Sequence, residues 1–96
     1  MKPSQALELH REDIRAIVAR HRTVNPRVFG SVLKGQDGDD SDLDLLVDPL
    51  PGATLLDLGA LQVELEEALG VRVDVLTPRE IPGRFREGIV SEARPV

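Results

Sequence analysis

The stretch that most constrains the fold is Asp42 to Asp48, DLDLLVD, because apolar and acidic residues alternate along it. Positions 43, 45 and 47 are Leu, Leu and Val, so one face of an extended strand here is wholly apolar. A period of two places the side chains of Asp42 and Asp44 on the opposite face, next to each other. Such a strand needs helices over its apolar face, and these must come from the rest of the chain.

Helical periodicity predicts three further segments, and alternation predicts two more strands. The expected helices are Ser4–His21, which Ser4 caps, Thr54–Leu69, which Gly70 ends, and Gly83–Glu92. The second of these begins with a loose capping box of Thr54 and Asp57 and carries an apolar seam formed by Leu55, Leu58, Leu61, Leu65 and Leu69. Thr77-Pro78 with Glu80 indicates one more helix start. The expected additional strands are Arg27–Phe29 and Val71–Leu76. The order helix, strand, strand, helix, strand, helix predicts an α+β fold with a small mixed β-sheet flanked by helices, forming a single domain over residues 1–96.

The composition excludes several classes of function. The 96 residues include no Cys, so disulfides, thiolate metal sites and cysteine nucleophiles are excluded. No apolar run is long enough for a membrane span, and the polar N-terminal segment does not resemble a leader, so a cytoplasmic protein is expected. A net charge of −5 with only two aromatic residues argues against direct nucleic-acid binding.

The paired carboxylates of Asp42 and Asp44 are typical of a site for hard cations. Mg²⁺ prefers oxygen ligands and binds through a few carboxylates together with substrate phosphates. A third carboxylate is expected from another strand, and Asp74 lies in the middle of a run of valines where an unpaired charge would be costly. Arg72 lies on the same face and could instead neutralise Asp74 in a structural ion pair, and the sequence leaves both interpretations open.

A second candidate feature is the Gly30-Ser31 step, which follows the short strand expected at Arg27–Phe29. Glycine lets the backbone approach a ligand closely, and N–H groups at the start of a helical turn can hold phosphates. Lys34 lies one turn later and could reach a phosphate, although a solvated lysine is the simpler interpretation of this residue by itself. The acids of the loop that follows are interpreted as solvent-facing: Asp37, Asp39 and Asp40. The segment fits neither an EF-hand nor a Walker loop.

Together, Gly30-Ser31, ten intervening residues and Asp42-Leu43-Asp44 resemble the GS-x10-DxD signature of the DNA polymerase beta-like nucleotidyltransferases. With the later VDVLTP, the chain resembles the minimal nucleotidyltransferases that act as antitoxins beside HEPN-domain toxins. The resemblance implies that Gly30, Ser31 and Lys34 hold the triphosphate of ATP. It also implies that Asp42, Asp44 and Asp74 bind two Mg²⁺ ions and form the catalytic site.

The resemblance further implies a reaction and a partner. The chain would transfer AMP from ATP to a tyrosine of a HEPN-domain ribonuclease toxin. It contains no Tyr of its own, so modification of its own tyrosines is excluded. Two alternatives stay open: an antitoxin that neutralises its toxin by binding alone, and a nucleotidyltransferase with a small-molecule acceptor such as an aminoglycoside.

Overall fold

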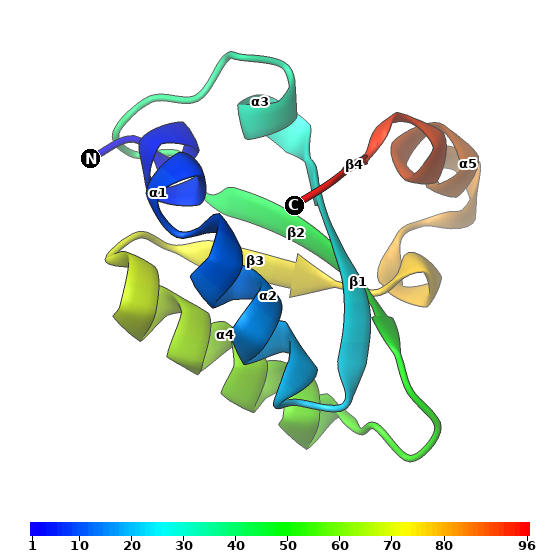
Figure 1. The fold of residues 1–96 in the computed structure, drawn as a ribbon. Helices are drawn as coiled ribbons and strands as arrows, with labels where there is room; N and C mark the ends of the chain where they lie inside the picture. Colours follow the sequence, from blue (N-terminus) through cyan, green and yellow to red (C-terminus); the bar gives the residue numbers. More distant parts are fainter.

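The computed structural model describes residues 1–96, which fold around a four-stranded sheet in the order β3-β2-β1-β4 (Figure 1). β1 (Thr23–Phe29) pairs antiparallel with β2 (Leu43–Pro49) and with the two-residue edge strand β4 (Arg94–Pro95). β3 (Val73–Leu76) runs parallel to β2. The sheet is therefore mixed, as predicted, and β1 and β2 are neighbours.

Three helices cover one face of this sheet: α1 (Pro3–Leu9), α2 (Arg11–Ala19) and α4 (Leu55–Leu69), which connects β2 to β3 (Figure 1). Aliphatic side chains from these helices and the strands form one core, and the predicted apolar face of β2 is its centre. Its residues Leu43, Leu45 and Val47 are fully buried. The other face of β2 carries the acidic residues, so the alternation in the sequence separates the core from the candidate site.

The predicted helix over Ser4–His21 is wrong in its extent, because it is two helices separated at His10. The first helix begins at Pro3 rather than at a Ser4 cap, and proline is favoured at the first helical position since it has no N–H to satisfy. The second ends at Ala19. Buried residues occur at helical spacing on both sides of the break, so the hydrophobic period alone could not reveal it.

β1 is longer than the predicted Arg27–Phe29 and includes Asn25 and Pro26. The register with β2 shifts between Val24 and Arg27, and Asn25 adopts a left-handed conformation with φ 56°. Proline cannot donate a ladder hydrogen bond and is tolerated in a strand at such an irregularity. The two residues therefore bend the strand instead of preceding it.

α4 begins as predicted after Thr54, whose N–H donates to Oδ2 of Asp57 at 2.8 Å, and it ends at Gly70 in the left-handed conformation. Its predicted apolar seam is only partly buried. Leu61, Leu65 and Leu69 are in the core, whereas Leu55 is 78% exposed. The first turn of α4 extends past the edge of the core.

The chain after β3 forms a single 3-10 turn, η1 (Pro78–Glu80), and then α5 (Gly83–Glu92). α5 has the predicted bounds, but none of its residues is buried, and Phe85 is 49% exposed. Figure 1 shows α5 and η1 away from the layer formed by α2 and α4. No helix of the chain combines the length and the apolar character that a transmembrane span requires.

Candidate active site

Asp44 of β2 and Asp74 of β3 are direct partners in the parallel ladder, so their side chains lie on the same face of the sheet. Burial and the negative charges of Asp74 and Asp42 raise the pKa of Asp44 to about 6. Burial also raises the pKa of Asp74, and the carboxylates of Asp42 and Glu80 add to that effect. This pair of like charges would be stabilised by a cation between them.

Asp42 precedes β2 by one residue, whereas the sequence predicted that the strand begins there. Its Oδ1 atom lies 2.9 Å from Nε of Arg72, and both side chains are well exposed. Arg72 was an alternative partner for Asp74, but its ion pair is with Asp42 instead. Asp74 forms no ion pair, so the interpretation of Asp74 as one half of a structural salt bridge is wrong.

Gly30 lies beside Asp44 because it directly follows Phe29, the ladder partner of Asp44 in β1. A Cβ atom at position 30 would lie only 2.1 Å from Oδ2 of Asp44, and the backbone φ of Gly30 is 73°. Both facts require glycine here. The predicted phosphate-holding step and the predicted metal-binding carboxylate are therefore in contact, although they are distant in the sequence.

Ser31 lies in the single turn α3 (Gly30–Leu33), which begins directly after β1, and Lys34 ends that turn with an exposed side chain. Asp37, in the loop that follows, is not simply solvated as predicted. Its Oδ2 atom accepts a hydrogen bond of 2.9 Å from the N–H of Ser4, and this lowers the pKa of Asp37. The loop is thus tied to the start of α1, whereas Asp39 and Asp40 are exposed.

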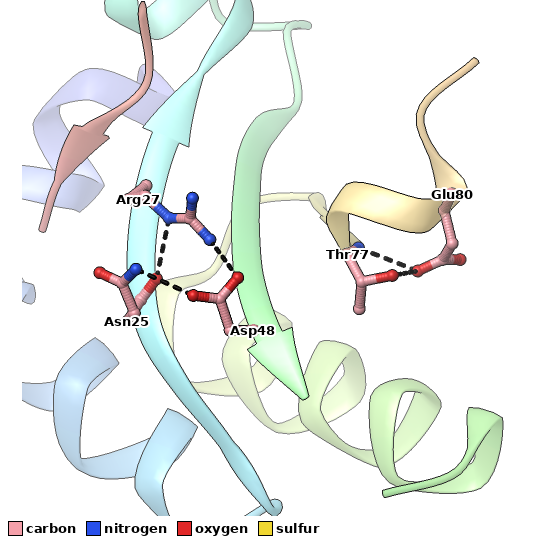
Figure 2. Close-up of polar contacts among 5 residues, drawn as sticks. All are labelled: Asn25, Arg27, Asp48, Thr77 and Glu80. Carbon is pink, nitrogen blue, oxygen red and sulfur yellow. Dashed lines mark hydrogen bonds and ion pairs between the residues drawn. The ribbon is translucent and has the colours of Figure 1, made fainter. Parts of the chain in front are cut away.

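Asp48 is the remaining acid on the same face of β2, and it has partners of its own (Figure 2). Nη2 of Arg27 lies 2.6 Å from Oδ1 of Asp48, and the side-chain amide of Asn25 donates to Oδ2 at 3.0 Å. Arg27 is only 11% exposed and also donates to the carbonyl of Asn25. Asp48 therefore stabilises the irregular part of β1 and is not available as a ligand.

Glu80 is a residue that the sequence did not assign to the site, although it was noted as a helix-start signal after Thr77. Its Oε1 atom accepts hydrogen bonds from the N–H and the hydroxyl of Thr77, at 2.9 and 3.1 Å (Figure 2). These bonds hold the turn η1 directly after β3. The negative charge of Glu80 acts on Asp74, so η1 brings a further acid near the site.

The donor set fits a divalent cation in its chemistry. Three carboxylates supply only oxygen ligands, which Mg²⁺ prefers, and the pKa values of Asp44 and Asp74 are raised by burial and by neighbouring negative charges. No three acidic or histidine side chains already surround one point in the structure. Asp42 is held by Arg72, so it would have to turn toward Asp44 and Asp74 to complete a shared site.

Comparison with known proteins agrees with this geometry. A family model described as a nucleotidyltransferase domain matches residues 10–96. A predicted protein adenylyltransferase of Methanocaldococcus jannaschii is 40% identical over 77 residues, which cover 80% of this chain and 83% of that protein. A solved structure of a predicted minimal nucleotidyltransferase is 46% identical, with a TM-score of 0.86 over 97% of this chain and 95% of the other.

A toxin–antitoxin complex with AMP-PNP contains a chain with the same fold, at 20% identity and a TM-score of 0.74 over 88% of this chain and 69% of that one. This last likeness concerns the fold alone. The family match spans the whole sheet and both segments of the sequence signature. The chain therefore belongs to the nucleotidyltransferase domain family and is an enzyme of that class.

Proposed function

We propose that this chain is a Mg²⁺-dependent protein adenylyltransferase that moves AMP from ATP to a tyrosine of a HEPN-domain ribonuclease toxin and thereby acts as its antitoxin. The observation that carries the proposal is the opposed pair Asp44 and Asp74, with Gly30 in contact with Asp44. The relative from Methanocaldococcus jannaschii, predicted to be a protein adenylyltransferase, supports the reaction. The toxin–antitoxin complex with AMP-PNP supports the partner and the nucleotide.

In this reaction the hydroxyl oxygen of the acceptor tyrosine attacks the α-phosphorus of ATP. A new O–P bond forms, the bond from the α-phosphorus to the oxygen that bridges to the β-phosphorus breaks, and pyrophosphate leaves. Asp74 lies opposite Asp44 on the same face of the sheet and takes the hydroxyl proton, which it passes to solvent.

The remaining site residues position the nucleotide. Gly30 and Ser31 present backbone N–H groups and a hydroxyl to the phosphates, and Lys34 adds a positive charge from the end of the same turn. Asp42, Asp44 and Asp74 would hold two Mg²⁺ ions. When bound, these ions neutralise phosphate charge and stabilise the attacking and leaving oxygens.

The test is incubation of the purified chain with ATP labelled at the α-phosphate, Mg²⁺ and the purified toxin. Label is expected on a toxin tyrosine, and it should be lost with EDTA or in Asp44→Asn. Asp39→Asn removes the same charge from the exposed loop and should transfer normally. Absence of label with the wild-type chain, or equal transfer by Asp44→Asn, would contradict the proposal.

A second candidate is an antitoxin that neutralises by binding alone. The exposed apolar side chains of α4 favour it, since Leu55, Leu56 and Val63 are 78%, 85% and 55% exposed. Cells that express the toxin distinguish the two functions. Protection by Asp42→Asn/Asp44→Asn equal to that of the wild-type chain would support binding alone, whereas loss of protection with intact complex formation would support catalysis.

A further inference from the structure

Arg72 and Asp42 form a pair next to the opposed aspartates. Arg72 lies two residues before Asp74, as Asp42 lies two residues before Asp44. The N–H of Leu43 donates to the carbonyl of Arg72 at 2.9 Å, so the residues that precede β2 and β3 lie side by side. Alternation places Asp42 on the face of Asp44, and Arg72 on the face of Asp74. The same face therefore carries one pair of like charges and, next to it, one pair of opposite charges.

The pair of Arg72 with Asp42 differs from the other ion pair on this face. The side chain of Arg27, which binds Asp48, is only 11% exposed. Arg72 is 70% exposed and Asp42 is 47% exposed. An exposed ion pair contributes little to stability and is readily exchanged, whereas a largely buried pair is costly to break. The Arg72 pair is thus the displaceable one.

We propose that Arg72 is a displaceable counter-ion that holds the carboxylate of Asp42 until a divalent cation takes that carboxylate from it. The inference rests on the proposed function, because it requires a cation at Asp42, Asp44 and Asp74. Arg72 is a positioning residue and does not itself bind the cation. A second hydrogen bond from Arg72 to the carbonyl of Asp40 keeps the guanidinium near the site after the exchange.

Two forces oppose the cation in this arrangement. Asp42 must leave Arg72 before it can act as a ligand, and the guanidinium charge repels the cation as it approaches. Both are weak because the pair is exposed, and both weaken further when salt screens the charges. Removal of the guanidinium should therefore strengthen metal binding by a small but measurable factor, and the factor should shrink with salt.

The first experiment compares Mn²⁺ and Mg²⁺ binding by calorimetry in the full-length wild-type chain, Arg72→Gln and Arg20→Gln. Arg20 is a matched control, since it forms an exposed ion pair with Glu64 on the helical layer. Arg72→Gln is expected to bind about two- to five-fold more tightly at low salt, and the advantage should largely vanish in about 1 M KCl. Arg20→Gln should bind as the wild type does.

A second measurement observes the ion pair itself. The Nε–H group of Arg72 should give a resolved ¹H–¹⁵N signal, assigned by its absence in Arg72→Gln. Addition of Mg²⁺ should shift or broaden this signal toward that of a free arginine. The Nε–H signals of Arg27 and Arg86 are internal controls, because these groups donate to the carbonyls of Asn25 and Pro78 and should not change.

The outcomes separate this inference from the proposed function. Equal affinities of the wild-type chain and Arg72→Gln would overturn the role of Arg72 and leave the metal site in place. Weaker binding by Arg72→Gln would show that Arg72 holds Asp42 ready as a ligand, and this too would overturn it. No metal binding by any of the chains would overturn both.

Discussion

Asp44 and Asp74 are opposed across two parallel strands, and neither forms an ion pair with a basic side chain. Two carboxylates in this arrangement repel each other when both are ionised, and the protein gains nothing in stability from them. The structure therefore keeps two mutually repelling carboxylates side by side, one on the central strand β2 and one on the edge strand β3. Such a conflict is expected where a site is prepared for a cation.

Asp44→Asn should stabilise the metal-free protein while it removes the transferase activity. The pKa of Asp44 is about 6 in the folded chain and 3.8 in the ordinary state, so the folded chain favours the protonated form. The ionised carboxylate thus lowers the free energy of unfolding near pH 7, by about 1 kcal/mol after allowance for solvent screening. Urea unfolding in EDTA measures the difference, and a destabilised Asp44→Asn would contradict this prediction.

The difference in stability between the wild-type chain and Asp44→Asn should depend on pH. Because the folded pKa of Asp44 lies above the ordinary value, the wild-type chain loses stability as the pH rises from about 4 to 6 and keeps its full stability below that window. The stability of Asp44→Asn relative to the wild type should therefore increase from near zero at pH 4 to a plateau above pH 7. Unfolding free energies measured across that range, in EDTA, check the curve. A constant difference would argue against the raised pKa.

Mg²⁺ should raise the melting temperature of the wild-type chain. A ligand that binds only the folded state at ten times its Kd stabilises it by about 1.4 kcal/mol, which corresponds to ~6–11 °C for a domain of this size. Asp44→Asn should show little of this shift, because it loses a ligand. Thermal melts with and without Mg²⁺ measure both effects, with K⁺ at equal ionic strength as the control. A shift of the same size in Asp44→Asn would place the cation elsewhere.

Gly30→Ala should abolish metal binding while it destabilises the fold only slightly. The new Cβ would lie 2.1 Å from Oδ2 of Asp44, so the carboxylate must leave its present position beside Asp74. Gly35→Ala is the matched control, since Gly35 also has a positive φ, of 70°, but a Cβ added there would meet no atom within 4 Å. Both variants should lose about 1 kcal/mol through backbone strain. Only Gly30→Ala should lose Mg²⁺ binding and AMP transfer, and normal transfer by it would contradict the contact.

Asp48→Asn should have the opposite effects: it should destabilise the fold and leave metal binding nearly unchanged. It leaves the largely buried guanidinium of Arg27 without its charged partner, so the chain should lose about 1–3 kcal/mol of stability. The variant should still bind Mg²⁺ with an affinity close to that of the wild type, because Asp48 is engaged with Arg27 and Asn25. Chemical unfolding and calorimetry measure the two quantities. A large loss of metal affinity would mean that Asp48 belongs to the site.

The sequence predicted the parts of the fold that depend on local patterns. The alternation in residues 42–48 identified the central strand and both of its faces, and Thr54 with Asp57 identified the start of α4. The residues Gly30, Asp44 and Asp74 were selected from turn chemistry, alternation and a family resemblance. The structure brings these three together, because strand register fixes which residues become neighbours.

The features that the sequence did not predict depend on contacts between distant segments. The inclusion of Asn25 and Pro26 in β1 is supported by Asp48, which comes from another strand. The assignment of Arg72 to Asp42 rather than Asp74 depends on how two strand ends are aligned, and alternation alone allowed either partner. The break at His10 leaves the hydrophobic period unchanged, so no pattern in the sequence marks it.

The crossover from β2 through α4 to β3 also determines when the site can exist. Asp44 leaves the ribosome well before Asp74, and the two meet only after the 15-residue helix between them has packed and β3 has joined the sheet. Contacts of such long range form late, because the intervening chain must be ordered first. A cation shared by these two residues would therefore recognise the finished fold alone. Its supply in the cell would then influence how long each newly made chain escapes proteolysis.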